Sequence, residues 1–277
     1  MKSTITHSPA NIFIFCALAC EAKPLIAHFG LKKLPPPNVF DIYQHESIVL
    51  SITGVGKANM AAGVAYTLAT VKAPTHPILI NIGIAGHRSA ALGSLFAAEK
   101  ISDFDSARHY FPQLLPHAFC TTLPLETVSQ PRQDYAQESL YDMEASAFYE
   151  IAVRFTTSEL ILTLKVVSDN QDAGITQINA VLVSAWITAH LDTVERLLVL
   201  LDKRVQHVQE GESEHFEQLI RQHHFTVSEK VQLKALLLRW ELLSERRELP
   251  VTLSEFKNTR AFLEALSTQL ARLPVVL

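Results

Sequence analysis

The sequence has no surplus of positive charge and no apolar run long enough to cross a membrane. Its 277 residues include 24 Lys and Arg against 28 Asp and Glu, a formal net charge of −4. A nucleic-acid-binding surface needs a surplus of cations, so nucleic acid is not an expected partner. A membrane span needs about 20 consecutive apolar residues. The short apolar run 12–19 is followed at once by Glu21 and Lys23, and predicts a first strand rather than a signal peptide.

Cysteine is scarce, and nothing resembles a metal site. The three cysteines, Cys16, Cys20 and Cys120, lack the spacing of metal ligands. An odd and sparse count fits a protein of the reducing cytoplasm, which is the expected location. The histidines are scattered, and the pair His223 and His224 has no further ligand types beside it. We therefore expect neither a metal nor another cofactor.

Glycine-rich phosphate motifs are incomplete. Residues 53–57 (Thr-Gly-Val-Gly-Lys) lack the third glycine of a dinucleotide fingerprint and the spacing of a P-loop. Such a loop either brings backbone amides to an anion or makes a tight turn into the Ala-rich helix predicted at 58–70. The pattern leaves both open.

Apolar residues are plentiful, at 48% of the chain. Continuous apolar runs at 11–19, 77–82 and 160–164 are typical of parallel strands covered on both faces. A strand pair is predicted at 39–44 and 47–52, and a further strand at 95–103. With helices predicted between the strands, the sequence indicates an α/β fold.

Two acids stand out in the second half of this region. Residues 141–148 predict a helix start with Asp142 and Glu144 in its opening turn, where the helix dipole favours negative charge. Ser168 and Asp169 follow the strand predicted at 160–164. Ligands of open α/β sheets bind at the carboxyl ends of strands, so Glu144 and Asp169 could face one pocket. On spacing alone, ordinary dipole and capping roles are the favoured explanation of both acids.

Asp-Met-Glu-Ala-Ser-Ala at 142–147, followed by Val-Ser-Asp at 167–169, resembles the nucleoside phosphorylase/nucleosidase superfamily. The most similar branch is the methylthioadenosine/S-adenosylhomocysteine nucleosidases. Segments 17–21, 53–57 and 81–86 match the family in the same order. The resemblance implies a mixed central sheet flanked by helices, a three-layer sandwich, and a homodimer.

The resemblance also implies roles in cleaving a ribosyl–base bond. Asp169 would protonate the departing purine, and Ser168 would hold Asp169 in place. Glu144 would accept hydrogen bonds from ribose hydroxyls, with Met143 packed on the sugar. Glu21 would activate a water molecule.

Small residues complete the implied binding site. The family loop that contains Gly54 lies near the sugar. Gly83, Ile84 and Ala85 would let the backbone pack against a flat ligand.

Phosphorolytic relatives carry a Gly-Asp-Pro loop with an arginine after the first strand. Here residues 16–21 lack that arginine and end on Glu21, which would repel phosphate. The resemblance therefore favours a nucleosidase that hydrolyses a purine nucleoside. Lys57 and Arg88 could still serve a phosphate, so a phosphorylase is one alternative. A family member that binds a nucleoside without turnover is another.

The segment 104–140 predicts irregular structure and is shorter than in the family, so base recognition does not carry over. Its residues 108–112 contain aromatics that stack on a base or simply pack at the surface. Asp103 and Asp105 are predicted to be solvated loop acids.

The resemblance covers residues 1–209 and not the tail 210–277. Thr226 with Glu229, and Thr252 with Glu255, match the capping box of a helix start. The tail therefore predicts a C-terminal extension of two or three helices.

Overall fold

The computed structural model describes residues 11–113, 119–132, 135–210, 214–244 and 249–271. The chain divides into two compact units, 1–205 and 206–277. Each unit has its own hydrophobic core, and each is described by itself.

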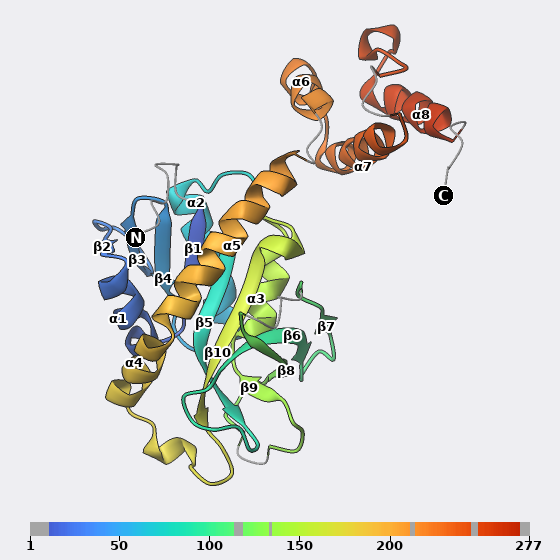
Figure 1. The fold of residues 1–277 in the computed structure, drawn as a ribbon. Helices are drawn as coiled ribbons and strands as arrows, with labels where there is room; N and C mark the ends of the chain where they lie inside the picture. The colour runs from blue at the N-terminus through green and yellow to red at the C-terminus, as the bar shows by residue number, and fades with distance from the viewer. Residues whose placement is uncertain (1–10, 114–118, 133–134, 211–213, 245–248, 272–277) are drawn as a thin grey trace. The chain divides into compact units, whose positions relative to one another are not determined.

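The first unit is built around one mixed sheet of ten strands (Figure 1). The strands are β1 Ile12–Cys16, β2 Lys32–Lys33, β3 Asp41–His45, β4 Ile48–Ile52, β5 Ile78–His87, β6 Leu95–Asp103, β7 His109–Tyr110, β8 Thr121–Thr127, β9 Leu140–Asp142 and β10 Ile161–Asp169. Their order is β10-β6-β8-β9-β5-β1-β4-β3-β2, with β7 beside β6. Because β10 also pairs with β5, one end of the sheet closes on itself. The predicted α/β fold with a mixed central sheet is confirmed.

Helices cover this sheet. They are α1 Ala19–His28, α2 Lys57–Val71, α3 Ala145–Ala152, α4 Ala180–Ala189 and α5 Leu191–Glu210, with short 3₁₀ turns η1 Ser158–Leu160 and η2 Ile175–Gln177. Helix α1 packs against α4, and α2 packs against α3. In Figure 1, α4 and α5 lie on the near side of the sheet.

The predicted buried strands are confirmed as β1, β5 and β10. They run parallel, with β5 between the other two. Phe13 and Phe15 on β1 are fully buried, and removing each such side chain from water contributes about 1.5–3 kcal/mol. Because the three strands are parallel, their carboxyl ends meet at one edge of the sheet. That edge brings together the loop after Cys16, the end of β5 near Gly86 and the end of β10 at Asp169.

Two predictions of secondary structure in this unit are wrong. Asp142 ends strand β9 rather than entering a helix, and Glu144 is the N-cap residue before α3. The reason is that Asp142 Oδ2 accepts the N–H of Ala145, 2.8 Å away, which fixes the strand-to-helix turn. The segment 104–140 is not wholly irregular, because it contains β7 and the seven-residue β8. Pro124 inside β8 lies where the pairing with β6 shifts register, a place where proline is tolerated.

The second unit contains three described α-helices, α6 Glu214–Gln222, α7 Val227–Ser244 and α8 Thr259–Leu270, and the 3₁₀ turn η3 Leu253–Glu255. The capping box at Thr226 is confirmed: its N–H donates to Glu229 Oε2 at 2.8 Å, and its Oγ1 accepts the N–H of Glu229 at 3.3 Å. The box predicted at Thr252 is wrong, because only η3 follows it. Helix α8 is instead capped by Asn258, whose Oδ1 accepts the N–H of Ala261. None of the described helices is long and apolar enough to cross a membrane.

Candidate functional site

A cavity of about 190 Å³ opens at the carboxyl ends of β1, β5 and β10. Seven of the predicted site residues line it: Glu21, Ile84, Ala85, Met143, Glu144, Ser168 and Asp169. Gly54 and Gly83 lie beside it. The N–H of Gly54 donates to the carbonyl of Ala17, and a Cβ at Gly83 would lie only 2.8 Å from Glu21 Oε1. Glycine at position 83 therefore leaves room for the Glu21 carboxyl group.

Glu21 is held rigidly although it is buried. Its Oε1 accepts the N–H of Ile84 at 2.9 Å, and its Oε2 accepts the N–H of Leu18 at 2.8 Å. Burial raises the pKa of Glu21, although the nearby charge of Lys165 and the backbone donors oppose this. A buried carboxyl group with a raised pKa is suited to accept a proton from a ligand or a water molecule.

Glu144 lines the same cavity from the turn between β9 and α3. Its Oε1 accepts the N–H of Gly56 at 2.8 Å. Burial, together with the negative charge of Asp142, raises the pKa of Glu144 to about 7. Both protonation states of this carboxyl group are therefore populated near neutral pH.

The Asp169 carboxylate is hydrogen-bonded through both oxygens. The Ser168 hydroxyl donates to Oδ1 at 2.5 Å, and the hydroxyl of buried Tyr135 donates to Oδ2. Burial and the adjacent Asp169 raise the pKa of Tyr135, so its phenol remains a donor. Tyr135 belongs to no motif that would have indicated this role from the sequence.

Lys165 is a further feature that sequence reasoning missed. This side chain is 1% exposed, and its Nζ lies 2.8 Å from Asp142 Oδ2. Desolvation opposes the charge of Lys165, but Asp142, Glu144 and Glu21 outweigh it and raise its pKa. A lysine inside the apolar run of β10 was the available signal, because a buried ammonium group requires an acidic partner.

Three carboxyl groups, those of Glu21, Glu144 and Asp169, line one cavity, and the charge of Lys165 interacts with the first two. Such a site can accept hydrogen bonds from ligand hydroxyl groups and exchange protons with a ligand. Within the part of the chain that the structure describes, no cluster of His, Cys, Asp and Glu could hold a metal ion.

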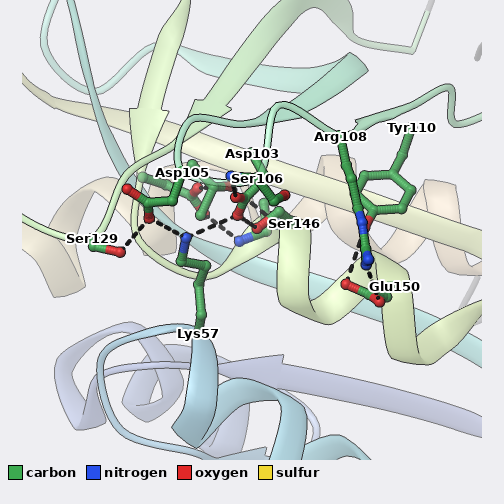
Figure 2. A network of polar contacts seen from close by, with 12 residues as sticks. Lys57, Asp103, Asp105, Ser106, Arg108, Tyr110, Ser129, Ser146 and Glu150 are labelled. Carbon is green, nitrogen blue, oxygen red and sulfur yellow. Dashed lines mark hydrogen bonds and ion pairs between the residues drawn. The ribbon is translucent and has the colours of Figure 1, made fainter.

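The predicted solvation of Asp103 is wrong. Asp103 is 7% exposed, and its Oδ2 accepts hydrogen bonds from Lys57 Nζ at 2.9 Å and the Ser146 hydroxyl at 2.7 Å (Figure 2). Burial alone would raise the pKa of Asp103, but the hydrogen bonds from Ser146, Lys57 and Ser106 lower it. Asp105 is exposed as predicted and contacts the same Lys57 ammonium group at 2.5 Å.

The segment 108–112, considered as a platform for a base, lies against α3 rather than in the cavity. Arg108 and Tyr110 both contact Glu150, at 2.7 and 3.1 Å (Figure 2). The apolar residues of the cavity wall include Val128, Ile175 and Ile178.

Comparison with known proteins shows similarity in fold. No family model matches the chain, and no curated protein matches it. The structure is similar to 5′-methylthioadenosine nucleosidase of Arabidopsis thaliana, with 17% identity and a TM-score of 0.58, over 70% of this chain and 97% of that one. It is also similar to the Campylobacter jejuni 5′-methylthioadenosine/S-adenosylhomocysteine nucleosidase, with 14% identity and a TM-score of 0.56, over 68% of this chain and 98% of that one.

Futalosine hydrolase of Helicobacter pylori is also similar, with 14% identity and a TM-score of 0.55, over 72% of this chain and 100% of that one. At these identities the similarity shows the fold alone. The resemblance expected from the sequence motifs is thus confirmed at the level of fold, and the site must be argued from its own geometry.

Proposed function

We propose that this chain hydrolyses the N-glycosidic bond of a purine nucleoside. The observation that carries the proposal is the convergence of Glu21, Glu144 and Asp169 on one cavity at the carboxyl edge of the sheet. Structures of similar fold are named as nucleosidases and hydrolases, and a Helicobacter pylori nucleosidase variant holds 5′-methylthioadenosine in its active site. That molecule consists of a purine, a ribose and a thioether substituent, so the leaving group in the proposal is the purine.

The reaction needs a proton at the leaving base and a base at the incoming water. As the bond between C1′ and the base nitrogen breaks, its electron pair goes to the base, and Asp169 in its acid form donates a proton there. Water forms the new bond to C1′, and Glu21 accepts the proton that the water loses. Solvent returns Asp169 and Glu21 to their starting states.

Glu144 and Met143 hold the sugar. The ionised form of Glu144 accepts hydrogen bonds from the ribose hydroxyls, and Met143 packs on the sugar. The backbone of Ile84 and Ala85 lies against the flat base. Lys165 compensates part of the negative charge around the sugar.

Hydrolysis is preferred to phosphorolysis for an electrostatic reason. Buried Glu21 faces the space where a phosphate would have to approach, and its charge would repel the anion. Lys57, the candidate phosphate ligand, has its ammonium group within 2.9 Å of Asp103 and 2.5 Å of Asp105. Arg88 lies 3.7 Å from Glu138, and neither Lys57 nor Arg88 is among the residues that line the cavity.

We further propose a homodimer, as the resemblance implies, with residues 1–209 as the nucleosidase domain and 210–277 as a helical extension. The sparse cysteines favour a location in the cytoplasm. Light scattering of the purified chain at several concentrations measures its mass in solution. A mass of twice 30.8 kDa is expected for a dimer.

Base release from adenosine, inosine and 5′-methylthioadenosine, with and without phosphate, tests the function. The wild type is compared with Asp169→Asn, and Asp41→Asn serves as a control because Asp41 is exposed on β3. We expect release that is independent of phosphate, lost in Asp169→Asn and unchanged in Asp41→Asn. Release only with phosphate would identify a phosphorylase, and binding without release would identify a non-catalytic nucleoside-binding protein.

A further inference from the structure

We propose that Lys57 is a positioning residue for Glu144, because it fixes the backbone N–H of Gly56 that holds the Glu144 carboxyl group at the cavity. This inference rests on the proposed function for its catalytic consequence. Its structural content, that Lys57 sets the environment of the Glu144 carboxyl group, can be measured without any reaction.

The contacts form a closed ring. The N–H of Gly56 donates to Glu144 Oε1 at 2.8 Å, and Lys57 is the next residue in the chain. Lys57 Nζ contacts Asp103 Oδ2 at 2.9 Å, and the same oxygen accepts the Ser146 hydroxyl at 2.7 Å. Ser146 lies in the first turn of α3, which begins directly after Glu144. Figure 2 shows Lys57 reaching up from the start of α2 to the acids at the end of β6.

The loop before α2 needs this anchor. Gly54 and Gly56 have φ angles of 85° and 101°, a region that glycine enters freely and other residues rarely adopt. Two such residues give the loop conformational freedom. The start of the loop is fixed by the hydrogen bond that the N–H of Gly54 donates to the carbonyl of Ala17. Its middle is held by Asn59 Nδ2, which donates to the carbonyl of Val55 at 2.8 Å. The Lys57 side chain fixes the end of the loop, directly beside the N–H that Glu144 uses.

The Lys57 contacts are stronger than an ordinary surface ion pair. The Asp103 side chain is 8% exposed and the Lys57 side chain 25% exposed, so solvent screens the pair only partly. Asp103 is also held by the N–H of Ser106 at 2.8 Å, which keeps its carboxylate in place. Asp105 binds the other side of the ammonium group and is itself bonded by the Ser129 hydroxyl.

Glu144 depends on this arrangement more than Glu21 depends on its own loop. Two backbone donors from different segments hold Glu21, whereas among the described residues one backbone donor, the N–H of Gly56, holds Glu144. Loss of the Lys57 ammonium group would let residue 56 move away from Glu144, so that the carboxyl group loses the hydrogen bond from the Gly56 N–H. The carboxylate would then no longer be fixed against the ribose hydroxyls.

The test compares Lys57→Met with Arg108→Gln and Lys57→Arg. Arg108→Gln is the matched control, because Arg108 also pairs with an acid at α3, Glu150, but does not touch the Gly56 loop (Figure 2). Lys57→Arg retains the charge. Thermal unfolding of each variant establishes that it folds.

The first readout is the ¹³C NMR titration of the Glu144 side-chain carboxyl group, assigned with Glu144→Gln, which requires no turnover. We expect the midpoint of about 7 to rise in Lys57→Met, because the hydrogen bond from Gly56 that lowers the pKa of Glu144 is lost, and to stay unchanged in Arg108→Gln. Lys57→Arg should retain most of the wild-type value. An unchanged midpoint in folded Lys57→Met would overturn the proposal.

The second readout is the ratio of kcat/KM for a ribonucleoside to that for its 2′-deoxy analogue. In Lys57→Met we expect this preference to fall about tenfold, the size expected for loss of one well-placed hydrogen bond to a charged group. Equal loss on both nucleosides would contradict a role through Glu144. If no variant, including the wild type, releases a base, the proposed function fails while the NMR titration still decides the role of Lys57.

Discussion

The hydroxyl group of Tyr135 donates a hydrogen bond to Oδ2 of Asp169, the carboxyl group proposed as the acid. Tyr135 is 2% exposed and is not among the residues that line the cavity. It packs against Tyr141, with ring centroids 5.9 Å apart, and beside Gly86, where a Cβ would lie 2.8 Å from its ring. Tyr135 therefore fixes the direction of Asp169 without occupying the space of a ligand.

Tyr135→Phe keeps the ring and removes this donor. We expect base release to fall by about tenfold and the free energy of unfolding to fall by about 1 kcal/mol, the usual net contribution of one such bond. Tyr43→Phe on β3 is the control, because Tyr43 lies outside the cavity. Steady-state kinetics and urea unfolding measure both effects, and equal rates for the two variants would remove Tyr135 from the site.

Lys165→Met leaves Asp142 charged and buried without its partner. Breaking a buried pair on one side costs about 3–5 kcal/mol, so this variant should be strongly destabilised or fail to fold. Lys33→Met breaks the ion pair with Asp41, whose side chains are 55% and 50% exposed, and should cost at most about 1 kcal/mol. Chemical denaturation measures the free energy of unfolding of both variants. Similar losses in Lys165→Met and Lys33→Met would show that the pair of Lys165 and Asp142 does not stabilise the fold.

Glu144 makes the stability of the fold depend on pH. Its folded pKa of about 7 lies above its ordinary value of 4.5, so its contribution is full below pH 4.5 and is lost as the pH rises through 7. This difference in pKa corresponds to a change in the free energy of unfolding on the order of 3 kcal/mol between these pH values. Glu144→Gln lacks this loss, so its stability relative to the wild type should rise between pH 4.5 and 7. Thermal unfolding across that range measures the difference, and a constant difference would contradict the raised pKa.

The two units predict separable effects of core substitutions. Leu237 is fully buried in the core of the second unit, and Leu79 is fully buried on β5 of the first. Each change to alanine should cost about 2–5 kcal/mol. Leu237→Ala should destabilise the second unit and leave base release at low temperature unchanged. Leu79→Ala should reduce the stability of the first unit and the rate of base release. Calorimetry with the release assay checks this, and loss of release in Leu237→Ala would argue against independent units.

Much of the first unit was predictable because its central strands are continuous apolar runs. Strand β8 was not, because Pro124 and polar residues interrupt its pattern. The burial of Asp103 was hidden for another reason. It depends on Lys57, which lies 46 positions earlier in the chain.

The candidate site shows the same division. Glu144 and Asp169 could be paired from their predicted places at a helix start and a strand end, whereas Glu21 joined them only through the family resemblance. Tyr135 contacts Asp169 across 34 positions and belongs to no motif, so only the folded chain reveals it. Lys165 was recognisable in principle, since a charge inside a buried strand requires a partner.

The central claim is that water attacks a nucleoside at this cavity. The most direct measurement is base release from 5′-methylthioadenosine and adenosine in H₂¹⁸O with phosphate present, followed by mass spectrometry of the sugar. We expect a free sugar that carries one ¹⁸O at C1, formed by the wild type and not by Asp169→Asn. A sugar 1-phosphate without ¹⁸O, or no sugar product at all, would contradict it.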